Sequence, residues 1–194
     1  MTRLDLVVGP NGAGKSTFVR FTLAPLWPAA TFVNADVIAA QRWPDDQGAH
    51  AYEAAEIAAE TRRRLIALGR PFIAETVCSH PSKLELVDQA NRAGYHVALH
   101  VVMVPEDLSV ARVAARVAAG GHDVPAAKIR ARHQRLWAIV AEAVDRSATA
   151  TFWDNSRHDG PRMVALFSDG LPVGAPRWPT WTDSALSRRW PSGS

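Results

Sequence analysis

The chain has 194 residues, of which 47% are hydrophobic and 21% charged, and these values favour one folded domain and exclude a disordered protein. The formal net charge is only +3, so weak an excess of basic residues that we expect no nucleic-acid partner. The single cysteine, Cys78, excludes an intramolecular disulfide and a thiolate metal site. Because no apolar stretch has the length of a signal-peptide core or a bilayer span, we expect a cytoplasmic protein without a membrane partner.

Short apolar runs alternate with helical segments along most of the chain. Strands are predicted at residues 4–9, 31–34, 71–76, 96–104 and 149–154. Helices are predicted at residues 50–68, 82–93, 105–119 and 126–146, and another is expected after the glycine-rich loop that follows the first strand. Strands without polar interruption suit a parallel sheet that is covered on both faces. The alternation predicts an α/β doubly wound fold with a mainly parallel, five-stranded sheet.

The composition changes after residue 156. Residues 163–173 are typical of a hairpin around Asp169 and Gly170. The remaining tail is rich in proline and tryptophan and has no helical period. Its tryptophans could form an aromatic binding surface, but we expect a tail packed against the domain. Residues 157–194 are therefore expected to add a hairpin and a tail to the same domain.

A phosphate-binding motif follows the first predicted strand. Residues 9–16, "GPNGAGKS", match the pattern G-x-x-x-x-G-K-[ST] in full. In such a loop backbone N–H groups converge on the phosphates, the lysine reaches the β- and γ-phosphates, and the hydroxyl ligates Mg²⁺. The residues expected to bind the nucleotide are Gly9, Asn11, Gly12, Ala13, Gly14, Lys15, Ser16 and Thr17. The chain lacks the Asn-Lys-x-Asp element of GTPases and the Leu-Ser-Gly-Gly signature of ABC-type ATPases, which leaves a small kinase or an ATPase switch.

Two acidic residues lie at predicted strand ends. Asp36 follows the second strand and Glu75 ends the third, at the edge of the sheet where ligands of open α/β folds bind. Phosphoryl transfer needs a base near the acceptor hydroxyl and an acid that helps to hold Mg²⁺. Asp36 suits the first role, although Asp36 or Asn34 could instead only cap the next helix. Glu75 in an apolar strand needs a partner, and Mg²⁺ or a substrate hydroxyl would serve.

Arginines supply the cations that a transferring phosphoryl group requires. Arg112 and Arg116 lie one helical turn apart on the helix predicted at residues 105–119. Arg132 falls on the inward side of the following helix, where it could bring a second charge to the γ-phosphate. Gly120 and Gly121 separate the two helices and could form a lid that closes over the nucleotide. Solvated surface arginines are the alternative, and Arg112 could exchange roles with Arg116.

Five segments together resemble the zeta toxin family of P-loop kinases. They are "GPNGAGKST", "NADVIAA", "FIAET", "ARVAARVAAGGHDVPAAKIRARHQR" and "WDNS". The resemblance runs from residue 4 to about residue 156, and it implies a P-loop kinase domain in residues 1–156 with a lid at about 117–127. It also implies a kinase that uses ATP and Mg²⁺ to phosphorylate a sugar hydroxyl, which in the best known members belongs to UDP-N-acetylglucosamine.

The resemblance implies roles for the matched residues. Asp36 would be the base, and Lys15, Arg116 and Arg132 the other catalytic residues. The acceptor would contact Asn34, Asp36, Glu75, Thr76 and His80; Ser16 and Glu75 would hold the metal, and Arg112 and Asn155 would contact the nucleotide. The turn that contains Asn155 is similar to the one beside adenine in related kinases, or is simply a polar strand end.

Three hypotheses remain open on the sequence. The first is a sugar or nucleotide-sugar kinase, acting as a toxin with a separate antitoxin as its partner. The second is a metabolic or resistance kinase that uses another small hydroxyl acceptor, as chloramphenicol phosphotransferases do on a similar core. The third is a module in which ATP binding only changes the shape offered to a protein partner.

Overall fold

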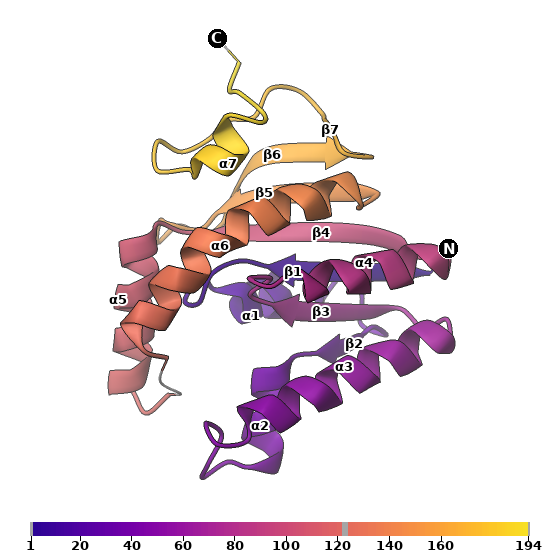
Figure 1. Cartoon of the computed structure of the whole chain (residues 1–194), viewed down its shortest axis with the longest axis vertical. Coiled ribbons are helices and arrows are strands. Elements are labelled where there is room, and N and C mark those ends of the chain that lie inside the picture. The colour runs from indigo at the N-terminus through magenta and orange to yellow at the C-terminus, as the bar shows by residue number, and fades with distance from the viewer. Residues whose placement is uncertain (1, 122–123, 194) are drawn as a thin grey trace.

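The computed structural model describes residues 2–121 and 124–193. Within these ranges the chain forms a seven-stranded sheet in the order β2-β3-β1-β4-β5-β6-β7, with helices on both faces (Figure 1). His122 and Asp123, which belong to the predicted lid, lie outside the described residues. No helix in the described ranges has the length and apolar character needed to cross a membrane.

Five parallel strands form the body of the sheet. β1 lies between β3 and β4, β2 pairs with the far side of β3, and β5 pairs with the far side of β4. Their bounds are Arg3–Val8 for β1, Thr31–Val33 for β2, Phe72–Thr76 for β3, His96–Met103 for β4 and Thr149–Asp154 for β5. The doubly wound parallel arrangement predicted from the apolar runs is confirmed, and the carboxyl ends of neighbouring strands meet along one edge.

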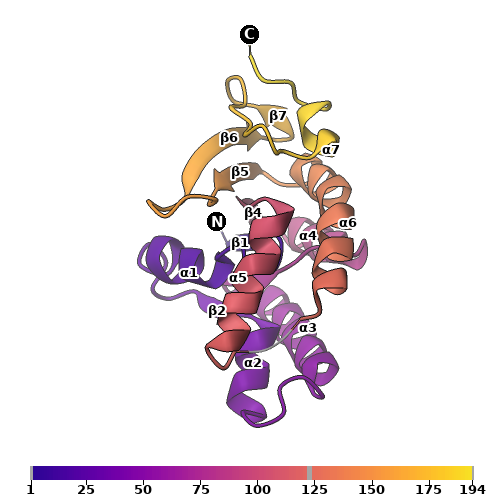
Figure 2. The same ribbon diagram turned by 90° about the vertical axis from the view of Figure 1, so that its left-hand side faces the viewer.

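Helices cover the two faces of the sheet unequally. Helices α3, α4 and α6 pack on one face over the larger core, while α1 and the short π-helix η1 cover the other (Figure 2). Their bounds are Lys15–Phe18 for α1, Val19–Leu23 for η1, Ala35–Arg42 for α2, Ala51–Ala67 for α3, Ser82–Arg92 for α4, Glu106–Ala118 for α5 and Ala126–Asp145 for α6. The four long helices predicted from the sequence, α3 to α6, differ from these bounds by at most one residue at either end.

The C-terminal hairpin extends the sheet to seven strands, whereas the sequence predicted five. β6, Arg162–Ser168, pairs antiparallel with β5, and β7, Leu171–Pro172, pairs with β6. Asp169 and Gly170 both have positive φ, 48° and 77°, which is the geometry of a tight hairpin turn. The extension has a physical reason, because β5 would otherwise present unpaired backbone groups at the edge of the sheet.

The tail packs on the hairpin side of the domain through its tryptophans. The Trp178 ring lies 5.1 Å from that of Phe152, and the Trp190 ring 4.6 Å from that of Phe167. The Trp178 indole N–H donates to the Trp190 carbonyl at 2.7 Å. One turn of helix, α7 (Ser184–Ser187), interrupts a tail in which no helical period was found. These contacts bury aromatic area that would otherwise face solvent.

A polar cluster is buried inside the sheet, beneath α1 and η1. Asp5, in the middle of β1, accepts two hydrogen bonds from the Arg3 guanidinium, each 2.8 Å long, and contacts His100 Nε2 on β4 at 2.9 Å. Burial raises the pKa of Asp5, but the hydrogen bonds from His100 and Arg3 outweigh it and lower the pKa below its usual value. The ionised carboxylate therefore stabilises the fold.

Asp5→Asn is expected to destabilise the protein by about 3 kcal/mol at pH 7, because a buried pair loses one partner. Since folding lowers the pKa of Asp5, its contribution is complete above about pH 4, the unfolded pKa, and is lost as the pH falls through the lower folded value. Urea unfolding between pH 3 and pH 7 measures the free energy of unfolding. The difference in this free energy between Asp5→Asn and wild type should become smaller as the pH falls toward 3. Asp159→Asn, which removes an exposed pair with Arg162, is the control. A difference in the free energy of unfolding that stays constant down to pH 3 would contradict this role for Asp5.

Candidate functional site

The phosphate-binding loop connects β1 to α1 and is shaped by glycine. Gly9 has φ 147°, and a Cβ atom there would lie 2.1 Å from the Val102 carbonyl oxygen, so no larger residue fits. Gly14 has φ 86° at the N-cap of α1, and a Cβ atom there would lie 2.6 Å from Asn155 Nδ2. The backbone therefore turns tightly enough for its N–H groups to converge on one anion.

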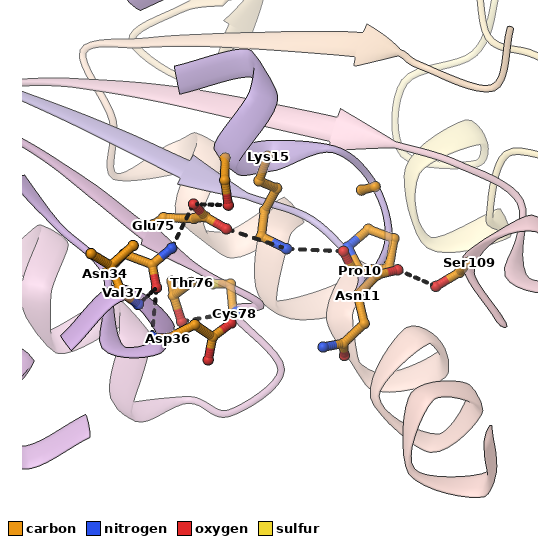
Figure 3. A network of polar contacts seen from close by, with 12 residues as sticks. Pro10, Asn11, Lys15, Asn34, Asp36, Val37, Glu75, Thr76, Cys78 and Ser109 are labelled. Atoms are coloured by element: carbon orange, nitrogen blue, oxygen red, sulfur yellow. Dashed lines mark hydrogen bonds and ion pairs between the residues drawn. The ribbon is translucent and has the colours of Figure 1, made fainter. Parts of the chain in front are cut away.

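Lys15 occupies the centre of the site. Its side chain is buried, and Nζ donates to the Pro10 carbonyl at 2.9 Å and lies 4.0 Å from Glu75 Oε1 (Figure 3). Burial lowers the pKa of Lys15; Glu75 and Asp36 act in the opposite direction, and Arg116 and Arg132 lower it further. Four charged residues expected in the site therefore lie within electrostatic range of one ammonium group.

Glu75 links the phosphate-binding loop to Asn34, the residue that follows β2. Its Oε2 accepts hydrogen bonds from Ser16 Oγ at 2.8 Å and from Asn34 Nδ2 at 2.7 Å (Figure 3). The Glu75 side chain is only 8% exposed, so the ammonium, hydroxyl and amide groups around it offset the cost of burying a carboxylate. This arrangement holds together the two residues that the sequence assigned to a metal, Ser16 and Glu75.

Asn34 also orients the start of α2. Its Oδ1 accepts from the backbone N–H of Asp36 at 2.7 Å and of Val37 at 3.4 Å, so Asn34 rather than Asp36 is the N-cap (Figure 3). The Asp36 carboxylate is thereby left in the first turn of α2, on an exposed residue. Both ends of the Asn34 amide are engaged within the protein, which makes it a positioning residue between Glu75 and Asp36.

Asp36 faces a small cavity of about 180 Å³, named here the Asp36 cavity. It is lined by Ala35, Asp36, Ala39, Gln47, Ala51 and Arg116. Thr76 and His80, which were expected on the acceptor side, are not among these residues. The Thr76 hydroxyl accepts from the Cys78 backbone N–H at 3.5 Å, and His80 Nδ1 lies 2.9 Å from Ser82 Oγ at the start of α4. The cavity thus lies between the first two turns of α2, the last turn of α5, and the start of α3 with the loop before it.

The three candidate arginines, Arg112, Arg116 and Arg132, differ in their surroundings, and so does Arg130, which lies close to Arg132 on α6. Arg112 lies against the phosphate-binding loop: a Cβ atom added to Gly12 would lie 3.2 Å from the Arg112 Cβ. Arg116 lines the Asp36 cavity. Arg132, on α6, is half-buried; burial lowers its pKa and the nearby Asp36 opposes that shift. Arg130 is directed elsewhere, because it pairs with Glu106 at 2.6 Å and Asp107 at 2.8 Å and so joins α6 to α5.

The geometry agrees with the comparisons to known proteins. Residues 4–139 match the family model described as the AAA domain. The chain belongs to this AAA domain family. A comparison with curated proteins found no match.

Several solved structures share the fold of this AAA domain. A chain of the AvrRxo1-ORF1:AvrRxo1-ORF2 complex with ATP superposes with a TM-score of 0.68 at 15% identity, over 89% of this chain and 60% of that one. A chain of the PezAT toxin-antitoxin system of Streptococcus pneumoniae superposes with a TM-score of 0.63 at 14% identity. The match covers 88% of this chain and 74% of that one. A candidate kinase from Chloroflexus aurantiacus superposes with a TM-score of 0.54 at 17% identity. The match covers 69% of this chain and 76% of that one. These likenesses confirm the predicted zeta-toxin-like P-loop kinase fold; the chain spans 60% of the AvrRxo1 chain that it matches.

Three residues of the chain have contacts at the candidate site that the sequence did not predict. Ser109 Oγ on α5 donates to the Asn11 carbonyl, and Asn155 Nδ2 donates to the Ala13 carbonyl at 2.8 Å, so both side chains bind the phosphate-binding loop directly. The expected nucleotide contact of Asn155, in a turn similar to the one beside adenine, stays a prediction. Gln47 reaches the Asp36 cavity from the loop between α2 and α3. A serine on the apolar side of a helix was a usable signal for Ser109, whereas nothing near Gln47 in the sequence indicated a site.

Proposed function

We propose that the protein is an ATP-dependent kinase that transfers the γ-phosphoryl group to a sugar hydroxyl, on UDP-N-acetylglucosamine or a related amino sugar. The observation that carries this proposal is the single charged centre around Lys15. One ammonium group is coupled to the phosphate-binding loop, to Glu75 on the metal side and to Asp36 at a separate cavity. A donor site and an acceptor site that share their charges are what phosphoryl transfer requires.

Nucleotide binding is supported by the loop itself. Lys15 Nζ would exchange the Pro10 carbonyl for the β- and γ-phosphates, whose charge also favours the ammonium form. Asn11 Oδ1 is buried on the same loop and finds no hydrogen-bond donor among residues 2–121 and 124–193. ATP is the nucleotide bound in the AvrRxo1 structure, and we propose the same donor here.

Ser16 and Glu75 suit Mg²⁺ as the accompanying metal. Their hydroxyl and carboxylate oxygens lie 2.8 Å apart, and both are the hard ligands that Mg²⁺ prefers. The described parts of the chain contain no group of three or more His, Cys, Asp or Glu residues that could hold a metal, which is consistent with an ion bound largely by phosphates and water. When bound, Mg²⁺ supplies charge neutralisation at the β- and γ-phosphates.

The residues around the Asp36 cavity can carry out the transfer. The acceptor hydroxyl oxygen would attack the γ-phosphorus, and the Asp36 carboxylate would accept the proton that this hydroxyl loses. Arg116 and Arg132 would then balance the charge on the transferring group, and Lys15 would hold the leaving oxygen of ADP. Lid closure through Gly120 and Gly121 would exclude water, so that transfer to the acceptor is favoured over hydrolysis.

The acceptor is identified by incubating the protein with ATP, Mg²⁺ and a panel of UDP-sugars, amino sugars and other small hydroxyl compounds. Mass spectrometry should detect one phosphate added to one member of the panel, and Lys15→Ala should abolish the product. Binding of ATP without transfer to any acceptor would instead support the nucleotide-dependent switch.

The comparisons also motivate a toxin hypothesis, because PezAT is a toxin-antitoxin system and AvrRxo1-ORF1 is seen in complex with a second protein. We propose that this chain has a separate protein antitoxin. Induced expression should then slow bacterial growth, and Lys15→Ala should relieve the effect. Normal growth together with strong transfer to a simple sugar would favour the metabolic kinase.

A further inference from the structure

The loop of residues 43–50, between α2 and α3, is closed at its base by an aromatic pair. The Trp43 and His50 rings stack with centroids 4.5 Å apart and planes within 5° of parallel. Hydrogen bonds inside the loop add to this closure, from Asp46 N to the Trp43 carbonyl at 3.2 Å and from Ala49 N to Asp46 Oδ1 at 3.3 Å. These contacts restrict the conformations of the loop, named here the clasped loop, before any ligand binds.

Gln47 lies within the clasped loop and lines the Asp36 cavity. Its Nε2 donates to the Pro44 carbonyl at 3.3 Å. Because a carbonyl only accepts, this bond fixes which end of the amide is nitrogen. The Gln47 Oε1 atom remains as an acceptor, and no residue in the described ranges donates a hydrogen bond to it.

The cavity is of a size that suits one compact ring. Its volume of about 180 Å³ is more than ten times the ~15 Å³ that a cavity needs in the same measure to hold one water molecule. Three alanines supply apolar wall, while Asp36, Arg116 and Gln47 supply the polar groups. Such a mixture suits a small polyhydroxylated ring, which has apolar C–H faces and a rim of hydrogen-bonding groups.

We propose that Gln47 determines acceptor specificity: its Oε1 accepts a hydrogen bond from an O–H or N–H group of a sugar ring bound in the Asp36 cavity, at a position other than the hydroxyl that is phosphorylated. The inference rests on the proposed kinase function. Asp36 and Gln47 occupy the same cavity, so one ring can present the reacting hydroxyl to Asp36 and a second donor group to Gln47. The clasped loop supplies the rigidity that selects among ring positions.

The test combines one substitution with a set of deoxy sugars derived from the acceptor. Gln47→Leu keeps the approximate size of the side chain and removes the acceptor atom. The acceptor KM should rise about tenfold, with kcat and the KM for ATP unchanged, because one hydrogen bond is lost in binding. Wild type should also discriminate about tenfold against one particular deoxy sugar, and Gln47→Leu should not. The control is Gln41→Leu on the exposed surface of α2.

The outcomes separate this inference from the proposed function. If wild type phosphorylates a sugar but Gln47→Leu retains its discrimination against every deoxy analogue, the role of Gln47 is wrong and the kinase stands. If wild type phosphorylates nothing, the kinase proposal fails, and saturation-transfer NMR with the monosaccharides then decides whether the cavity binds a ring. Binding that Gln47→Leu weakens would support the inference, and equal binding or none would overturn it.

Discussion

Arg132→Ala is expected to lower kcat at least ~10³-fold while leaving nucleotide affinity within a few-fold of wild type. An arginine that balances the charge of a transferring phosphoryl group is worth this much in related chemistry. Arg132 is half-buried, and its charge is felt by both Lys15 and Asp36. Its guanidinium is thus within electrostatic range of both Lys15 and Asp36, the two groups that flank the proposed transfer. Single-turnover kinetics at saturating ATP measure the effect.

Arg130→Ala is the matched control, because Arg130 lies on the same helix within one turn of Arg132. It pairs with Glu106 and Asp107 and has no comparable coupling to Lys15. The control should cost some stability by loosening α6 from α5, with little change in kcat. An equal loss of kcat in both variants would mean that packing of α6, rather than the Arg132 charge, supports turnover.

Asp36→Asn is expected to lower the transfer rate by about 10²- to 10⁴-fold, the usual contribution of a positioned general base. Binding of the nucleotide should persist, since the loop contacts of Lys15 and Ser16 do not involve Asp36. The cap of α2 belongs to Asn34, so the substitution should leave the helix intact. Stopped-flow binding of a fluorescent ATP analogue, together with the rate of product formation, separates the two effects.

Asp45→Asn, on an exposed residue of the clasped loop, provides a charge-matched control for Asp36. It removes the same charge outside the lining of the Asp36 cavity. Equal turnover in Asp36→Asn and wild type would exclude Asp36 as the base. Loss of ATP binding in Asp36→Asn would show that its role lies on the donor side.

Much of the fold was predictable because apolar runs and glycine stops carry local information. The run that became β4 has almost no polar interruption, and burial on both faces of a parallel sheet is its natural outcome. The predicted number of strands in the sheet was wrong because the pairing of one strand with another is not determined by local sequence. Nothing within residues 162–172 indicates whether the hairpin joins β5 or packs apart from the sheet, and the exposed edge of β5 decides it.

Residues of the candidate site were predictable where the chemistry fixes both residue type and spacing. The lysine and glycines of the phosphate-binding loop are such a case. The arginines are not, because Arg130 and Arg132 look alike in a helical pattern, and only packing against Glu106 separates them. Gln47 was missed for a related reason. Its role comes from the Trp43–His50 stack, a contact made across a loop without periodicity.

The most direct measurement follows the γ-phosphoryl group of labelled ATP in the presence of Mg²⁺ and a bacterial small-molecule extract. The charged centre around Lys15 predicts that wild type moves the label into one organic compound, and that Asp36→Asn and Arg132→Ala do so far more slowly. Label that appears only as inorganic phosphate, or stays in bound ATP, would contradict a kinase. Label transferred equally by all three proteins would contradict the site.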